Sequence, residues 1–310
     1  MQSNLLKAQV VIVERERYFL ESEKGLIQAK VSGRYHYTHV HKAEYPQVGD
    51  WVNYRLEIGD LAIIESVDER RSVLDRADVG SKQEKQILAV NIDKVFICIS
   101  ANKDFNLTKL RHFLLLTSKP ELKPVILLTK RDLSDQLESY IDQIKEITDV
   151  DVYPISVYYS EDIEGLKELI ENQTVVLIGA SGVGKSTLIN HLLDEEKLKT
   201  ADIRDTDGQG RHTTVHRELI RINETTAVID TPGIRIIGSY IIPENEFEDI
   251  ISLGEGCYFS DCKHDGEPGC MVEKAIHEGV LDPGRFEMYL KTLKRNAYFK
   301  RREAQKKHKK

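Results

Sequence analysis

A glycine-rich segment in the second half of the 310-residue chain carries the clearest chemical signal. It reads Gly179-Ala180-Ser181-Gly182-Val183-Gly184-Lys185-Ser186-Thr187 and fits the pattern G-x-x-x-x-G-K-[ST]. An apolar run precedes it, and an apolar helical pattern begins near Ser186. Glycines let backbone N–H groups and a helix N-terminus surround phosphates, while Lys185 reaches the β and γ phosphates and the Ser186 hydroxyl binds Mg²⁺. The segment therefore predicts a site for a nucleoside triphosphate with magnesium.

A second element for the phosphates, Asp230-Thr-Pro-Gly233, ends a short apolar run. An Asp at the tip of a neighbouring buried strand is placed to hold Mg²⁺ through water, and the Gly233 amide can turn toward a γ-phosphate. Between the two elements lies the polar stretch 208–214, GQGRHTT. We expect Thr214, in preference to Thr213, to supply the remaining Mg²⁺ ligand and to sense the γ-phosphate. The alternative is that this stretch is an ordinary loop.

A candidate base-reading element, Thr129-Lys130-Arg131-Asp132, follows an apolar run. It fits the pattern N/T-K-x-D, in which the Asp carboxylate accepts the N1 and N2 hydrogens of guanine, groups that adenine does not offer. Thr129 stands where Asn is usual. Ser156 ends a further apolar run, where a loop touching guanine O6 is expected. Both base elements precede the phosphate segment, whereas small GTPases place them after it.

Three cysteines and one histidine gather near the C-terminus, at Cys257, Cys262, His264 and Cys270. Three thiolates and one imidazole match a closed tetrahedral zinc site, and we expect one structural Zn²⁺. The alternative is a set of reduced cysteines without metal. Cys98, within the apolar run VFICIS, is expected to be an inert core residue.

The elements that must position these residues fall into three regions. The first, 1–71, contains five short strand patterns and predicts a small barrel, of the OB type in preference to an SH3-like one. In the second, 72–240, buried strand patterns alternate with helical patterns at 107–117, 134–147 and 163–171, which predicts a doubly wound parallel sheet. The third, 241–310, reads as helix, cysteine-containing loop and helix.

Composition places the chain among ordinary globular proteins, with 40% hydrophobic and 31% charged residues. No apolar run is long enough to cross a bilayer and the N-terminus lacks a signal pattern, so we expect a cytoplasmic protein that does not bind membranes. The net charge is −7, but residues 291–310 carry +9 and the rest carry −16. The basic end is either a phosphate-seeking arm for nucleic acid or a solvated helix end.

Taken together, these motifs resemble the ribosome small subunit-dependent GTPase A (RsgA) family. The resemblance runs through the barrel, TKRD, the Ser156 loop, GASGVGKST, GRHTT, DTPG and the cysteine cluster, in that order. It implies a circularly permuted GTPase that is a monomer, binds GTP and GDP with Mg²⁺, carries zinc and contacts the RNA of the small ribosomal subunit. It also implies GTP hydrolysis stimulated by that subunit during its late maturation. Thr129 and Val157 depart from the usual family residues.

The group that orients the attacking water is expected to be His212. Many GTPases place a Gln directly after the glycine of DTPG, but Ile234 stands there and cannot orient water. His212 lies beside the proposed Mg²⁺ threonines, so we expect it and Thr214 to act in the hydrolytic step. The alternative is that His212 contacts RNA or solvent.

Two other functions compete with regulated GTP hydrolysis. One is a nucleotide-gated RNA-binding assembly module in which hydrolysis is incidental. The other, an ATP-dependent kinase or transport ATPase, is disfavoured because Asp132 has a guanine-reading context.

Overall fold

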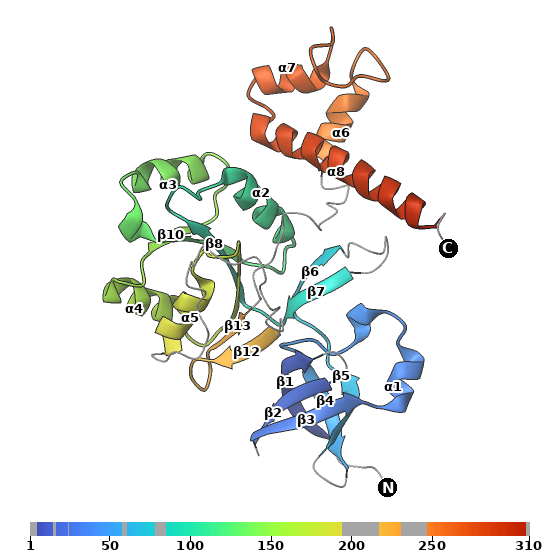
Figure 1. Cartoon of the computed structure of the whole chain (residues 1–310), viewed down its shortest axis with the longest axis vertical. Helices are drawn as coiled ribbons and strands as arrows, with labels where there is room; N and C mark the ends of the chain where they lie inside the picture. Colours follow the sequence, from blue (N-terminus) through green and yellow to red (C-terminus); the bar gives the residue numbers. More distant parts are fainter. Residues whose placement is uncertain are drawn as a thin grey trace. The chain divides into compact units, whose positions relative to one another are not determined.

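The structure is a computed structural model that describes residues 5–14, 17–23, 25–57, 61–77, 85–193, 217–230 and 247–307. The chain divides into two compact units, Met1–Arg76 with Gln83–Gly238, and Ala77–Lys82 with Ser239–Lys310. The first contains a barrel and an α/β domain, and the second contains the C-terminal helices (Figure 1). Within the described ranges, no helix is long and apolar enough to cross a membrane.

The N-terminal barrel is built from five strands, each of which contributes buried side chains to its core. The strands are β1 (Leu6–Glu14), β2 (Arg17–Ser22), β3 (Gly25–Val31), β4 (Trp51–Leu56) and β5 (Ala62–Val67). They close in the order β1-β2-β3-β5-β4-β1, with β3 and β5 parallel and the other pairs antiparallel. Helix α1 (Gly33–Thr38) and a 3-10 turn, η1 (Lys42–Glu44), lie between β3 and β4. This arrangement confirms the expected OB-type barrel.

The central domain has a six-stranded sheet with helices on both faces. Its strands are β8 (Lys94–Ser100), β9 (Pro124–Thr129), β10 (Val152–Ile155), β11 (Thr174–Gly179), β12 (Arg217–Arg221) and β13 (Ala227–Asp230). Their order is β10-β9-β8-β11-β13-β12, and every pair is parallel except β12 with β13. The predicted doubly wound sheet is confirmed, because parallel strands alternate with helices along the chain and these helices cover both faces of the sheet (Figure 1).

The helices that cover this sheet are amphipathic. One face carries α4 (Ser160–Leu169) and α5 (Lys185–Leu193), whose buried Leu166 and Leu188 pack with alternate residues of the strands. The other face carries α2 (Leu107–Leu116) and α3 (Leu137–Lys145) (Figure 1). Helix α3 begins three residues after the predicted start because Ser134 still belongs to the turn that follows η2 (Arg131–Leu133).

A two-stranded hairpin that the sequence patterns did not indicate joins the barrel to the sheet. It consists of β6 (Val73–Ala77) and β7 (Lys85–Val90). In the second unit, α6 (Glu248–Glu255), α7 (Met271–His277) and α8 (Pro283–Lys307) match the expected order of helix, cysteine loop and helix. The basic residues from 291 to 307 therefore extend along a helix.

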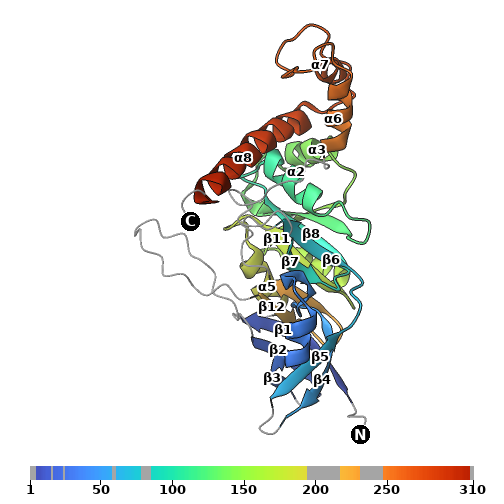
Figure 2. The same cartoon turned by 90° about the vertical axis from the view of Figure 1, so that its right-hand side faces the viewer.

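The barrel and the α/β domain share one continuous sheet because β1 has partners in both. The first half of β1 pairs with β4, and Ile12 and Val13 pair with Glu218 and Arg217 of β12. Figure 2 shows β12 beside β1 at this junction. Arg221 extends from β12 to the barrel, donating to the Glu21 carboxylate and to the Gln9 side-chain oxygen, both at 2.7 Å.

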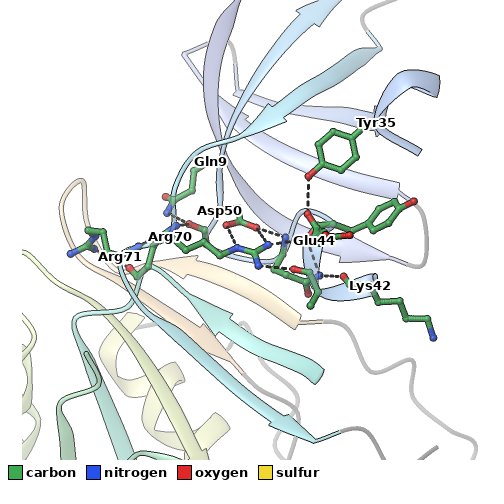
Figure 3. Close-up of polar contacts among 12 residues, drawn as sticks. Gln9, Tyr35, Lys42, Glu44, Asp50, Arg70 and Arg71 are labelled. Atoms are coloured by element: carbon green, nitrogen blue, oxygen red, sulfur yellow. Dashed lines mark hydrogen bonds and ion pairs between the residues drawn. The ribbon is translucent and has the colours of Figure 1, made fainter. Parts of the chain in front are cut away.

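Two consecutive arginines, Arg70 and Arg71, lie in the segment that leads from the last barrel strand, β5, toward the α/β domain. Arg70 donates to both oxygens of the Asp50 carboxylate, at 2.9 and 2.8 Å, and to backbone carbonyls before Asp50 (Figure 3). Asp50 is fully buried, and burial raises the pKa of its carboxyl while Arg70 opposes that shift. Arg71 instead donates to Asp93 and to the Asn91 carbonyl, which precede β8. One arginine is thus bound to the barrel and the next to the α/β domain.

Replacing Arg70 by Ala should lower the free energy of unfolding of the barrel by about 3–5 kcal/mol, because the buried Asp50 charge loses its partner. The exposed Arg55→Ala, which removes a surface pair with Glu65, serves as the control and should cost less than about 1 kcal/mol. Trp51 is the chain's single tryptophan and lies in β4, so its fluorescence during urea titration reports on this region. Equal unfolding midpoints for the two variants would contradict the expectation.

Candidate functional site

The glycine-rich segment forms the loop between β11 and α5, as its spacing requires. Gly182 and Gly184 have φ angles of +77° and +104°, in the region that L side chains rarely adopt. Lys185 is buried, and its Nζ donates to the carbonyls of Gly179 and Ala180 at 3.0 Å each. Burial lowers the pKa of Lys185. The loop thus holds the ammonium group of Lys185, whose positive charge can pair with the negative charges of a phosphate chain.

Asp230 lies at the end of β13, beside the strand that leads into this loop. Its partner in the parallel register is Leu177 of β11. Burial raises the pKa of the Asp230 carboxyl, and the positive charge of Lys185 opposes that rise. Ser186 follows Lys185 in the first turn of α5. A carboxylate and a hydroxyl are oxygen donors of the kind that Mg²⁺ prefers, so the donor set fits that ion.

Several predicted phosphate-side residues belong to parts of the chain that the structure leaves undescribed. Thr213, Thr214 and His212 precede β12, and Gly233 follows β13; all four lie outside the described residues. Their roles stay predictions from the sequence.

The base-reading residues line a cavity of about 190 Å³ next to the glycine-rich loop. Thr129, Lys130 and Asp132 contribute from the end of β9, and Val157 and Tyr158 contribute from the loop after β10. The glycine-rich loop and α5 add Val183, Gly184, Thr187 and Leu188. Three segments far apart in the sequence therefore meet at one cavity, because the ends of parallel strands lie along one edge of the sheet.

Thr129 and Lys130 bind the base-reading loop directly to the phosphate-side loop. The buried Thr129 hydroxyl lies 2.8 Å from the Val183 carbonyl and 3.2 Å from the Ile99 carbonyl, both of which accept from it. Lys130 has a φ of +61°, and its Nζ donates to the Gly182 carbonyl at 2.8 Å. Thr129 thus connects the base-reading loop to the glycine-rich loop. Unlike the Asn that is usual at this position, however, Thr129 has no side-chain amide that could bind a base.

Ser156 is buried at the end of β10, and its contacts order the loop that follows. Its hydroxyl accepts from the Tyr158 N–H at 3.2 Å, and its own N–H donates to the Asp162 carboxylate at 2.7 Å. Sequence reasoning missed Asp162, Tyr158 and Arg131. Arg131 occupies the variable position of the base-reading motif and Asp162 lies within a helical pattern, so neither position carried a signal.

The four predicted metal ligands come together in the C-terminal unit. Cys257, Cys262 and His264 lie between α6 and α7, Cys270 caps α7, and all four donor atoms lie within 4.8 Å of one another. His264 Nδ1 is 3.6 Å from Cys257 Sγ and 3.3 Å from Cys270 Sγ, and the two sulfurs are 4.0 Å apart. A tetrahedral site with Zn–S bonds of 2.3 Å separates its ligands by roughly 3.5–3.8 Å. The cluster therefore fits one metal ion.

Backbone N–H groups also point at these sulfurs. Met271 N donates to Cys257 Sγ, and Glu273 N donates to Cys270 Sγ, both at 3.4 Å. Such donors stabilise thiolates, the form in which cysteine binds metal.

Comparison with known proteins gives a consistent result over the whole chain. A family model described as RsgA GTPase matches residues 67–240. The chain is 39% identical to "Small ribosomal subunit biogenesis GTPase RsgA 1" of Oceanobacillus iheyensis, covering 96% of this chain and 87% of that protein. It is 36% identical to "Small ribosomal subunit biogenesis GTPase RsgA" of Opitutus terrae, covering 96% and 86%.

Solved structures of similar shape cover nearly all of the chain. The crystal structure of YjeQ from Thermotoga maritima has a TM-score of 0.62 and 26% identity, covering 93% of this chain and 96% of that one. YloQ, described as a circularly permuted GTPase, has a TM-score of 0.60 and 23% identity, covering 95% and 96%, and supports the fold alone.

Thr129→Val should weaken the binding of GDP about five- to thirtyfold, because the buried Val183 carbonyl loses its donor and the two loops lose a connection. Thr129→Ser keeps the hydroxyl and should stay within about threefold of the unaltered protein. Titration with a fluorescent GDP analogue measures both. If the valine variant binds as tightly as the serine variant, the hydroxyl does not support the site.

Proposed function

The chain is a GTPase of the RsgA family, and on that premise we propose that it hydrolyses GTP to GDP and phosphate on the small ribosomal subunit, late in the maturation of that subunit. The observation that carries the proposal is the single cavity at which Asp132, the Ser156 loop and the glycine-rich loop meet. An Asp carboxylate there selects guanine, and the glycine-rich loop holds the phosphates. Because its proposed substrate complex is the ribosomal subunit, we also propose that the protein acts in the cytoplasm and as a monomer.

The proposed binding mode uses residues 179–187 for the phosphates, with Lys185 on the β and γ oxygens. Ser186, Thr214 and Asp230 would hold Mg²⁺, which neutralises charge on the phosphates when bound. The Gly233 amide would donate to the γ-phosphate. Thr129, Lys130, Asp132 and Ser156 form the base side. The supporting observations are the two hydrogen bonds that the buried Lys185 Nζ donates to loop carbonyls, and the charge interaction between Lys185 and Asp230.

The hydrolytic step is assigned to His212, with Thr214 holding Mg²⁺ beside it. Ile234 has no group to orient water, and His212 is the titratable side chain next to the proposed Mg²⁺ threonine. In this proposal, contact between ribosomal RNA and the segment around His212 brings the imidazole to the attacking water, which would make hydrolysis depend on the subunit.

The RNA-contacting surfaces are proposed to be the barrel and the basic end of α8. On the barrel, α1 exposes Tyr37, at 90% of its surface, and the same helix also exposes Arg34 and His36. Aromatic rings stack on bases and cations pair with phosphates, so this combination suits RNA. The ten Lys and Arg residues of 291–310 suit the RNA backbone. The three domains are proposed to span 1–71, 72–240 and 241–310.

The decisive measurement is GTP turnover by the purified protein alone, with small subunits and with large subunits. We expect low turnover alone and stimulation by small subunits only. His212→Ala should keep its GTP affinity while its stimulated kcat falls about ten- to a thousandfold, the scale of losing a positioned catalytic group.

The outcomes separate the alternatives. Turnover that small subunits leave unchanged would favour a nucleotide-gated assembly module with incidental hydrolysis. Full stimulated turnover in His212→Ala would remove that residue from the mechanism. The group that orients the water would then be Arg235, which follows Ile234 in the sequence, or a ribosomal group.

The metal is proposed to be one structural Zn²⁺ held by Cys257, Cys262, His264 and Cys270. Protein purified without chelator should contain about one zinc per chain by elemental analysis, and Cys262→Ser should lose it on dialysis, together with the order of 245–285. Cys98→Ala is the matched control, because Cys98 is a buried core residue of β8. Zinc retained by Cys262→Ser at the level of this control would refute the ligand set.

A further inference from the structure

An ion pair that the recognised motifs do not specify joins the two loops that form the base side of the cavity. Arg131 follows β9 and faces Asp162 in the first turn of α4. Its Nε lies 2.6 Å and its Nη2 lies 2.8 Å from the two carboxylate oxygens of Asp162. The Asp162 side chain is only 11% exposed, and paired hydrogen bonds of this kind fix the orientation of both groups.

The same carboxylate also holds the second loop. Asp162 Oδ2, which accepts from Arg131 Nε, also accepts from the Ser156 N–H at 2.7 Å. The Arg131 guanidinium further lies over the Tyr159 ring, 4.5 Å from its centroid. One carboxylate thus connects the loop after β9 to the loop after β10.

The ion pair between Arg131 and Asp162 provides a link to the Ser156 loop that the contacts of Thr129 and Lys130 do not provide. The Thr129 hydroxyl binds the carbonyls of Val183 and of Ile99 in β8, and the Lys130 ammonium binds the Gly182 carbonyl, so none of these bonds reaches the Ser156 loop. Arg131 holds the base-reading loop from the Ser156 side. Asp132, the next residue, then enters the cavity from a backbone that is fixed in two directions.

We propose that Arg131 and Asp162 are positioning residues for guanine recognition, because together they set the Asp132 loop and the Ser156 loop at the separation that a guanine base requires. The proposal rests on the guanine-nucleotide site of the proposed function. Neither residue touches the nucleotide; both act through the loops that do.

A base-specific readout follows from this role. GDP uses both the phosphate side and the base side of the site, whereas ADP lacks the hydrogens that Asp132 accepts and depends on the phosphate side. Loss of the ion pair should therefore weaken GDP and leave the weak binding of ADP unchanged. General damage to the domain would weaken both nucleotides alike.

The test uses the full-length protein and measures GDP and ADP affinity by competition with a fluorescent GDP analogue. Arg131→Met should weaken GDP about ten- to a hundredfold and accelerate its release, with ADP within twofold. Arg131→Lys should recover part of the loss. Asp162→Asn should weaken GDP similarly, and the double variant should be no worse than the more damaging single one, because the residues act as a unit.

Glu161→Gln is the matched control. Glu161 precedes Asp162 in α4, and its Oε1 lies 3.3 Å from Arg131 Nη2, but its side chain is 80% exposed. It should stay within twofold for both nucleotides.

Absence of a guanine site and absence of a positioning role would give different results in these measurements. An unaltered protein that does not prefer GDP over ADP would refute the guanine site itself. A protein that prefers GDP, with Arg131→Met unchanged or with both nucleotides weakened in parallel, would overturn the positioning role and leave the guanine site standing.

Discussion

The pairing of β1 with β12 is the constraint on which the arrangement of the first unit depends. Through Ile12 and Val13 the barrel becomes an extension of the nucleotide-binding sheet, and Arg221 reinforces the pairing. Strand β12 leads directly into β13, whose last residue is Asp230. The barrel is therefore hydrogen-bonded to the strand that precedes β13 and Asp230, the carboxylate proposed to hold Mg²⁺. The position of the barrel is thereby tied to that of the glycine-rich loop's sheet.

The permuted order of the motifs leaves the site intact because the site is made by strand ends. The two base-side loops follow β9 and β10, and the glycine-rich loop follows β11. All three lie at the same edge of the sheet, and this placement does not depend on which loop comes first in the chain. Short-range contacts then complete the geometry. Thr129 and Lys130 bind the glycine-rich loop, and Arg131 binds the helix after Ser156.

The strands, the glycine-rich loop and the cysteine cluster could be predicted from the sequence, because each depends on a local pattern of residues. The spacing of residues 179–187 and of the four metal-ligand residues requires particular backbone geometry, and the buried strands are apolar and β-branched. The shared sheet was not predictable in this way. The pattern of Leu6–Glu14 indicates a strand but not its partner two hundred residues later. Arg131 carried no signal because its partner, Asp162, is identified only by the fold.

The shared strand also determines the order in which the chain can fold as it is synthesised. The barrel closes with β5, so it can form once about seventy residues have emerged. Its β1 edge, however, waits for β12, which is made about 150 residues later. During that interval Ile12 and Val13 lie on an open strand edge, the kind that pairs readily with other chains. Translation of the central domain is thus the period when a newly made chain is most exposed to aggregation.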